Sequence, residues 1–483
     1  MIHNCEVTGS NPAFITMVRN NHVGVYLTRS ARLLGTSAAL NKEAVMGRKS
    51  VISILCALLI VFSVGGLPAM AASKEGPDRY TATTADGVKL AIKHYRPNRT
   101  AKFRKGAQPI LLMPALATSI NEFDTRTPKG EEYYVKLPSP LQPWARGDKY
   151  IQNDHMRYYS LAHYLWLQGY DVWMANYRGQ GREPYVSGGA NGYSIDDIGV
   201  YDAPAIVKKV YGLTGKHPIW LGHSMGAMTA YIYLQGARYG FGFNPHVVSD
   251  PALVKKRNGG NSPESIKAFV DIDGPMVPFN GAALDNIFTW GGLAWPLYLD
   301  LRPFFIHNAV YYVDITLLFE DVLWHVCQTL GLQDLGPMNL LFSMNKDNYA
   351  PAVAKWGAKY CFDGFSTRVL AQFSDAAAHG LFREDFTNGQ WRLFPPDPYP
   401  GDGYYSYSDN LKKIKIPAFV IADDRVDITN PDDIKKFYLN KTRAALDAYL
   451  RVPDAAHVDI VCGLNAPTIT FPAIGRWLKK VCK

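Results

Sequence analysis

A serine between two glycines is the first feature of this sequence that could do chemistry. The segment Gly222-His223-Ser224-Met225-Gly226 fits the pattern G-x-S-x-G, in which a serine stands on a sharp turn between a strand and a helix. The apolar runs 217–221 and 227–234 on either side predict that strand and that helix. Small neighbours allow two backbone segments to approach, so that the hydroxyl stands clear of them. We therefore predict that Ser224 is a nucleophile.

A serine nucleophile needs a base that accepts its proton. His457 is the histidine that follows all the predicted strands, and it comes directly after the strand-like run 448–452. We predict that His457 is this base. His223 is next to Ser224 in the chain, but the turn should direct its side chain elsewhere, so we expect a structural role for it.

The base in turn needs a carboxylate that orients it. The turn after the apolar run 416–421 holds Asp423, Asp424 and Asp427. Asp427 is the predicted acid because its distances from the following proline and from His457 are typical of this role, and Asp424 is the alternative. An acidic cluster could also hold a metal ion, but no histidine or cysteine ligand pattern lies nearby. No metal and no other cofactor is expected.

The negative charge that forms on an attacked carbonyl oxygen needs backbone N–H donors. One donor usually follows the nucleophile, which makes it Met225, and the other comes from the loop after the third strand. That loop follows the run 109–113. Pro114 has no N–H to offer, and we predict that Leu116 provides the second donor.

The order of elements predicts how these residues are brought together. Strands and helices alternate along most of the chain, which indicates a mostly parallel sheet with helices on both faces. Asp86-Gly87 predicts a hairpin, Ser194 with Asp197 predicts a helix start, and Pro204 should bend or break that helix. Further strands are expected at 109–113, 170–175, 217–221, 266–272, 416–421 and 448–452, and further helices at 160–168, 227–234 and around Trp477.

The alternation stops between residues 278 and 409, where Trp, Tyr, Phe and Leu are abundant. A long apolar insertion of this kind predicts a largely helical cap or lid over the active site. The α/β core would then consist of residues 73–277 and 410–483. An extension of the core itself is the alternative.

The N-terminal part has the pattern of an export signal. Arg48 and Lys49 precede the apolar run 51–64, and Ala69-Met70-Ala71 follows it, so residues 46–72 are predicted to be a signal peptide. The run is shorter than the ~20 residues that span a bilayer, which makes a membrane anchor less favoured. Residues 1–45 are interpreted as an upstream extension, and we expect a periplasmic or secreted protein.

The composition excludes some partners. The 483 residues carry a net charge of +9, without any run rich in Lys and Arg, so a nucleic-acid partner is not expected. Four cysteines lie beyond the predicted leader: Cys327, Cys361, Cys462 and Cys482. They could form two disulfides, with Cys327 to Cys361 and Cys462 to Cys482 closing the shortest loops, or remain free thiols.

Several segments resemble the acid lipase family of the α/β-hydrolase superfamily, which includes gastric and lysosomal lipases. They are GYDVWMANYRGQG, the run from Tyr193 through LGHSMG, RVLAQFSDAAAHGLFREDF and His457-Val458-Asp459. The resemblance extends from about Tyr80 to Trp477. It departs from the family at Pro114-Ala115, where the family has His-Gly, in the aspartate-rich turn, and at residues 125–154, which resemble an insertion.

This resemblance implies an exported lipase or esterase that cleaves carboxylic esters with hydrophobic acyl groups through an acyl-enzyme. Its partners would be a hydrophobic ester or lipid and, transiently, a lipid surface; the sequence does not determine the oligomeric state. Acyl transfer to another alcohol is the closest alternative, because its first half-reaction is the same. A non-catalytic lipid-binding protein of this fold is the alternative from another class.

Overall fold

The computed structural model describes residues 78–95, 107–190, 192–242, 245–277, 297–303, 344–390 and 403–483. The predicted extension 1–45, the predicted signal peptide 46–72, Cys327 and most of the predicted cap lie outside the described residues. In the described part of the chain, no helix combines the length and the apolar content of a membrane span.

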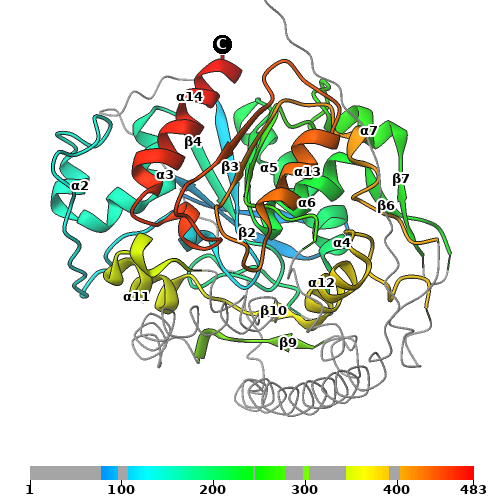
Figure 1. Cartoon of the computed structure of the whole chain (residues 1–483). Coiled ribbons are helices and arrows are strands. Elements are labelled where there is room, and N and C mark those ends of the chain that lie inside the picture. Colours follow the sequence, from blue (N-terminus) through cyan, green and yellow to red (C-terminus); the bar gives the residue numbers. More distant parts are fainter. Residues whose placement is uncertain are drawn as a thin grey trace, which may run out of the picture. The chain divides into compact units, whose positions relative to one another are not determined.

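An eight-stranded sheet forms the centre of the described structure (Figure 1), with the strand order β1-β2-β4-β3-β5-β8-β11-β12. The pairs from β4 to β12 are all parallel, whereas β1 and β2 form an antiparallel hairpin at one edge. The prediction of an α/β fold with a mostly parallel sheet is therefore confirmed. The strands are β1 (Arg79–Thr83), β2 (Lys89–Tyr95), β3 (Pro109–Met113), β4 (Asp171–Ala175), β5 (Ile219–His223), β8 (Ala268–Ile272), β11 (Ala418–Ala422) and β12 (Ala448–Arg451).

Two hydrophobic layers cover the two faces of the sheet. Successive strand residues alternate between them, because side chains in a strand point to opposite faces: Leu112 lies in one layer and Leu111 in the other. Helices α3 (Leu161–Leu167) and α14 (Phe471–Val481) contribute to the first layer. Helices α5 (Ala203–Thr214), α6 (Met225–Leu234) and α13 (Pro431–Asn440) contribute to the second.

The local signals in the sequence produce the expected turns. Gly87 has a φ of 86° in the β1–β2 hairpin, a conformation that glycine adopts without steric cost. Ser194 and Asp197 form a reciprocal capping box at α4 (Ile195–Asp197). A π-helical turn from Ile198 to Asp202 then separates α4 from α5, since Pro204 cannot continue the hydrogen-bond ladder of the preceding turn.

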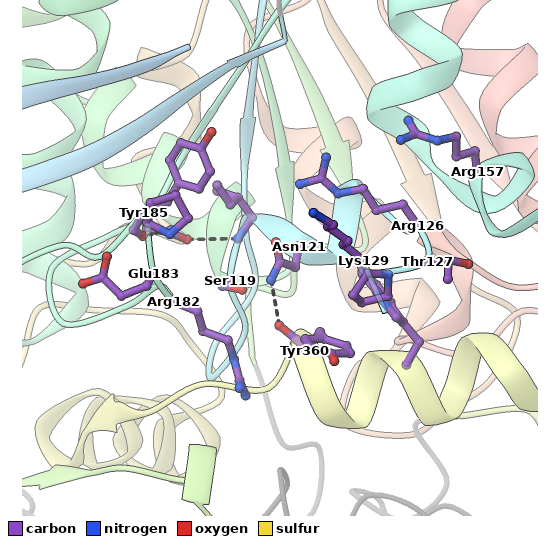
Figure 2. Close-up of a pocket in the computed structure, with 15 residues that line it drawn as sticks. Ser119, Asn121, Arg126, Thr127, Lys129, Arg157, Arg182, Glu183, Tyr185 and Tyr360 are labelled. Carbon is purple, nitrogen blue, oxygen red and sulfur yellow. Dashed lines mark hydrogen bonds between the residues drawn. The ribbon is translucent and has the colours of Figure 1, made fainter. Parts of the chain in front are cut away.

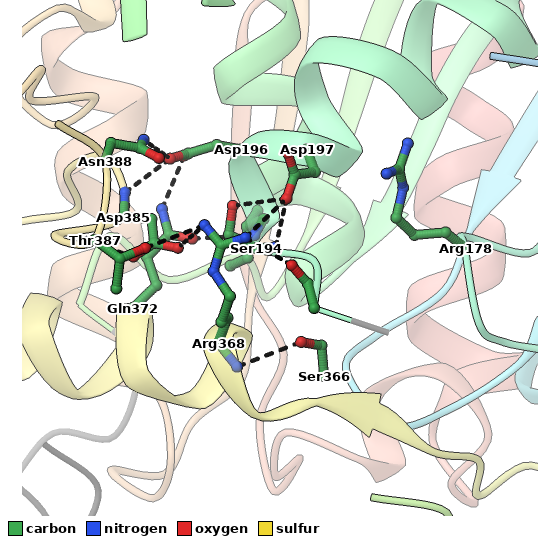
Figure 3. A network of polar contacts seen from close by, with 12 residues as sticks. Arg178, Ser194, Asp196, Asp197, Ser366, Arg368, Gln372, Asp385, Thr387 and Asn388 are labelled. Atoms are coloured by element: carbon green, nitrogen blue, oxygen red, sulfur yellow. Dashed lines mark hydrogen bonds and ion pairs between the residues drawn. The ribbon is translucent and has the colours of Figure 1, made fainter. Parts of the chain in front are cut away.

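The described part of the predicted cap contains a short ribbon and two helices. The ribbon pairs β9 (Tyr298–Leu299) with β10 (Phe365–Ser366), and the helices are α11 (Pro351–Tyr360) and α12 (Thr367–His379). The side-chain oxygen Oε1 of Gln372 in α12 accepts the N–H of Ile195 at 3.0 Å, and its side-chain amide nitrogen Nε2 donates to Asp196 at 2.9 Å. Figure 3 shows this network of polar contacts between α12 and α4. It attaches α12 to α4 of the core.

The described cysteines are free thiols. Cys361 and Cys462 are buried, and Cys482 is partly buried. The pairing of Cys462 with Cys482 is therefore absent. Burial raises the pKa of Cys462 to about 12, so this thiol is neutral and unreactive at physiological pH.

Candidate functional site

Ser224 lies in a strained backbone conformation between β5 and α6. Its φ is 53° and its ψ is −119°, outside the regions that residues other than glycine usually adopt. Gly222 and Gly226 make the turn sterically feasible, because a Cβ on Gly226 would lie 2.2 Å from the carbonyl oxygen of Met113. A Cβ on Gly222 would lie 2.3 Å from the carbonyl carbon of Gly226. The tight turn leaves Ser224 at the carboxyl end of the sheet.

His457 connects this serine to a buried carboxylate. Its Nε2 lies 2.9 Å from the Oγ of Ser224, and its Nδ1 lies 2.5 Å from the Oδ2 of Asp273. An ionised carboxylate only accepts hydrogen bonds, so Nδ1 donates to Asp273 and Nε2 is free to accept from the serine hydroxyl. All three side chains are less than a tenth exposed. In this arrangement the imidazole can take the hydroxyl proton while the carboxylate stabilises the resulting cation.

The topology of the sheet explains why Asp273 is close to the serine. Strand β8 lies beside β5, with Ile272 opposite His223, so Asp273 is the first residue past the neighbouring strand. The Asp273 carboxylate also accepts the N–H of Asp423 at 2.9 Å and the hydroxyl of Thr429 at 3.0 Å. These donors fix the orientation of the carboxylate toward His457.

Asp427, the acid predicted from the sequence, has a different contact. It is fully buried next to His457, but it accepts the backbone N–H of His457 at 3.0 Å, and the Nδ1 position is taken by Asp273. The alternative, Asp424, pairs with Arg451 at 2.6 Å on the surface. At Nδ1 the structure thus places Asp273, and neither the predicted acid Asp427 nor its alternative Asp424.

Several carboxyl groups share this buried region. Burial, together with the nearby Asp273, raises the pKa of Asp427 to about 6, although the charge of His457 acts in the opposite direction. Burial and the carboxylates of Asp273 and Asp427 raise the pKa of Asp423 well above its usual value. Burial therefore disfavours a further negative charge on Asp423 beside Asp273.

Leu116 and Met225, the predicted N–H donors, lie on two segments that are pressed together. Leu116 belongs to the loop 114–118 after β3, and Met225 is the first residue of α6. The Cβ position of Gly226 is 2.9 Å from the carbonyl oxygen of Pro114, so the start of α6 contacts the start of this loop. The two N–H groups therefore come from adjacent segments next to Ser224.

A second histidine–carboxylate pair contacts both the loop 114–118 and the backbone of His457. Glu122 accepts the N–H of Ala115 at 3.2 Å and the hydroxyl of Thr118 at 2.6 Å. It also lies 3.4 Å from the Nδ1 of His223, an ion-pair distance. The Nε2 of His223 lies 3.0 Å from the carbonyl oxygen of His457, and only a donating N–H makes that contact favourable.

The structural role expected for His223 is thus to connect Glu122 to the backbone of His457. Burial lowers the pKa of His223, but the Glu122 carboxylate and the His457 carbonyl raise it more, so the net direction is upward. Sequence reasoning did not identify Glu122, because nothing in the run INEFD distinguishes it from a surface residue of a short helix. Among the described residues, no group of three or more His, Cys, Asp or Glu side chains could hold a metal ion.

Comparisons with known proteins show similarity to hydrolases and lipases. The family model described as serine aminopeptidase, S33, matches residues 152–278, a range that includes Ser224 and Asp273. Lipase 3 of Drosophila melanogaster is 36% identical over 324 residues, which cover 65% of this chain and 75% of that protein. Lipase member N of Mus musculus is 26% identical over 414 residues, 83% of this chain and 87% of the relative. Lipase member M of Mus musculus is 21% identical over 416 residues, 83% of each.

Proposed function

The chain belongs to the α/β-hydrolase superfamily, in its acid lipase-like branch, and is a carboxylic ester hydrolase; on this basis we propose that Ser224, His457 and Asp273 form its catalytic triad. One observation carries the proposal: His457 contacts the Ser224 hydroxyl through Nε2 and the Asp273 carboxylate through Nδ1. Met225 and Leu116 provide the N–H groups for the oxyanion.

In the proposed reaction, the Ser224 oxygen attacks the ester carbonyl while its proton moves to the Nε2 of His457. The tetrahedral intermediate collapses, His457 protonates the departing alcohol, and an acyl-enzyme remains on Ser224. A water molecule then loses its proton to His457 and attacks the acyl carbon, which releases the carboxylic acid and restores the serine. Asp273 remains ionised and stabilises the imidazolium in both half-reactions.

We further propose that the acyl group is hydrophobic. The relatives are named lipases, and the segment 278–409 of this chain is rich in aromatic and aliphatic residues. Apolar surface that is removed from water contributes about 25 cal/mol per Å², so each added methylene strengthens binding in an apolar site. A preference for longer acyl chains follows from this.

The test is hydrolysis of p-nitrophenyl esters with acyl chains from two to sixteen carbons. We expect Ser224→Ala to lower kcat by a factor on the order of 10⁶, whereas Ser139→Ala, at an exposed serine, should keep the parent rate. Circular dichroism checks that each variant is folded. Added alcohols would reveal acyl transfer as a second product. A folded parent that cleaves no ester would contradict the proposal and favour the lipid-binding alternative.

We also propose that residues 46–72 direct export and are removed. The basic pair, apolar run and small residues of this segment support the proposal. N-terminal sequencing of the exported protein tests it, and a mature chain that still contains the apolar run 51–64 would contradict it.

A further inference from the structure

The insertion at residues 125–154 forms one wall of a pocket with a volume of about 380 Å³. Arg126 and Lys129 of the insertion line the pocket, together with Trp356 and Tyr360 of the cap helix α11. Figure 2 shows these insertion residues above the α11 ribbon. A segment that departs from the acid lipase pattern therefore creates a space between the core and the cap.

The insertion is firmly held against the core. The Asp154 carboxylate accepts the N–H of Thr127 at 3.0 Å and its hydroxyl at 2.8 Å. The indole N–H of Trp144 donates to the carbonyl oxygen of Pro467 at 3.0 Å, and its ring stacks on Tyr158 with centroids 5.3 Å apart. The first two contacts join the two ends of the insertion to each other, and Trp144 attaches its middle to the core.

The lining of the pocket is strongly basic. Arg126, Lys129, Arg157 and Arg182 line it, and Glu183 is the single acidic residue among the residues that line it. Figure 2 shows Arg126, Lys129 and Arg157 on one side and Arg182 on the other. Side chains of one sign around a pocket focus the field and attract a ligand of the opposite sign.

The basic side chains differ in how far they are neutralised. Arg126 lies 3.4 Å from Asp124, and Arg157 lies 3.4 Å from Asp154. Lys129 is exposed, and within the described ranges no carboxylate lies within ion-pair distance of it. At least one cation of the pocket therefore has no acidic partner in the described structure.

A buried hydroxyl adds a donor. Ser119 lines the pocket and is 1% exposed, and its Oγ has no hydrogen-bond partner in the part of the chain that the structure describes. Buried polar groups in proteins are almost always paired, so a hydroxyl of this kind at a pocket wall is suited to donate to a ligand. Figure 2 shows Ser119 between the two groups of basic side chains.

The pocket is within reach of the reaction centre. Ser119 is three residues from Leu116, and three residues of extended chain span at most about 11 Å. Asn176, which also lines the pocket, accepts the N–H of Ile120 at 2.9 Å and fixes the chain directly after Ser119. One wall of the pocket therefore lies within about 11 Å of Leu116, the residue at which the ester carbonyl is placed in the proposed reaction.

From these observations we propose that the pocket binds an anionic group of the ester substrate, a carboxylate or a phosphate. The inference rests on the proposed function, because it places the ester carbonyl at Leu116. Lys129, Arg126 and the Ser119 hydroxyl bind the anionic oxygens, since charge-assisted hydrogen bonds to such oxygens are the strong ones. The hydrophobic part of the acyl group then connects the ester carbonyl at Leu116 to the anionic group in the pocket.

The experiment compares matched esters on the full-length enzyme. One series consists of p-nitrophenyl monoesters of dicarboxylic acids from glutarate to sebacate, and the other of p-nitrophenyl esters of monocarboxylic acids of equal length. We expect kcat/KM for the best anionic ester to exceed that of its neutral match at least tenfold. Lys129→Glu should lower this ratio at least tenfold. Lys136→Glu, at an exposed lysine of the same insertion that does not line the pocket, should change it less than twofold.

A direct binding measurement distinguishes carboxylate from phosphate as the ligand, and it distinguishes the pocket proposal from the catalytic one. Calorimetric titration with glutarate and with inorganic phosphate, on the parent and on Lys129→Glu, shows which anion the pocket prefers. An enzyme that cleaves neutral esters without preferring or binding either anion overturns the pocket proposal and leaves the catalytic one intact. An enzyme that binds an anion through Lys129 but cleaves no ester overturns the catalytic proposal instead. If Lys129→Glu and Lys136→Glu lower the preference for anionic esters equally, general electrostatic attraction explains that preference. This result also overturns the pocket proposal.

Discussion

Replacing Glu122 with glutamine tests whether the Glu122–His223 pair supports catalysis. The side chain keeps its shape, and its amide oxygen can still accept the N–H of Ala115. It loses the negative charge that faces His223 and the second oxygen that accepts the hydroxyl of Thr118. The loop 114–118 and the backbone of His457 would therefore lose the Glu122–His223 pair that both contact.

The magnitude follows from these contacts. Two unit charges 3.4 Å apart attract each other by about 5 kcal/mol at an effective dielectric constant of about 20, which is an upper limit for the pair. The lost hydrogen bond to a charged acceptor contributes about 1.5–3 kcal/mol. If this energy holds the oxyanion loop in the transition state, kcat falls by about 10- to 150-fold. KM for a neutral ester should change little, because Glu122 is buried and contacts the loop 114–118 and His223.

The assay is steady-state hydrolysis of a p-nitrophenyl ester by the parent, Glu122→Gln and Thr118→Val. Each kcat is calculated from the concentration of folded enzyme. Thr118→Val removes the hydroxyl donor but keeps the Glu122–His223 pair, so it should cost less than Glu122→Gln. NMR of the His223 ring should show a lower pKa in Glu122→Gln, because the raising charge is gone. A variant with a parental kcat, or a loss that only reflects unfolding, would refute the reasoning.

Two further predictions concern stability. Gly226→Ala places a Cβ 2.2 Å from the carbonyl oxygen of Met113, so we expect a loss of about 1–3 kcal/mol and a large loss of activity. Gly212→Ala in α5, where a Cβ has open space, should stabilise the protein by about 0.5–1 kcal/mol. Urea unfolding measures the stability of both variants. Equal changes in the two would contradict a steric clash at Gly226. Burial raises the pKa of Asp427 to about 6 and of Asp459 to about 7. The folded state thus binds these protons more tightly than the unfolded chain, and stability should fall as pH rises from about 4 to 7. Thermal unfolding at pH 5 and pH 8 checks the sign, and a higher Tm at pH 8 would contradict it.

Much of the fold could be predicted because its signals are local. The strand–turn–helix at Ser224, the hairpin at Gly87 and the capping box at Ser194 depend on residues within a few positions of each other. Alternating strands and helices then left few arrangements of the sheet. The position of His457 could be predicted for the same reason, since it follows the last strand.

The carboxylate that faces Nδ1 of His457 could not be predicted in this way. Asp273 and Asp427 both follow predicted strands, and both are fully buried beside His457. Which carboxylate faces Nδ1 depends on the chain reversal at Asp273, where φ is 56°, and on the hydrogen bond from Thr429, far along the chain. Such tertiary contacts leave no periodic pattern in the sequence. The sequence did hold one signal, the position of Asp273 directly after the strand beside the nucleophile strand.

The most direct test of the proposed triad is the kcat of Asp273→Asn beside that of Asp427→Asn, measured on the same p-nitrophenyl ester. An asparagine at the Nδ1 position favours the wrong tautomer of the histidine, and the corresponding change in a serine protease lowers kcat by about 10⁴. We expect a loss of this order for Asp273→Asn and at most about tenfold for Asp427→Asn, which loses only the contact to the backbone N–H of His457. The reverse order, with Asp427→Asn nearly inactive and Asp273→Asn active, would contradict the assignment of Asp273 and restore Asp427 as the catalytic acid.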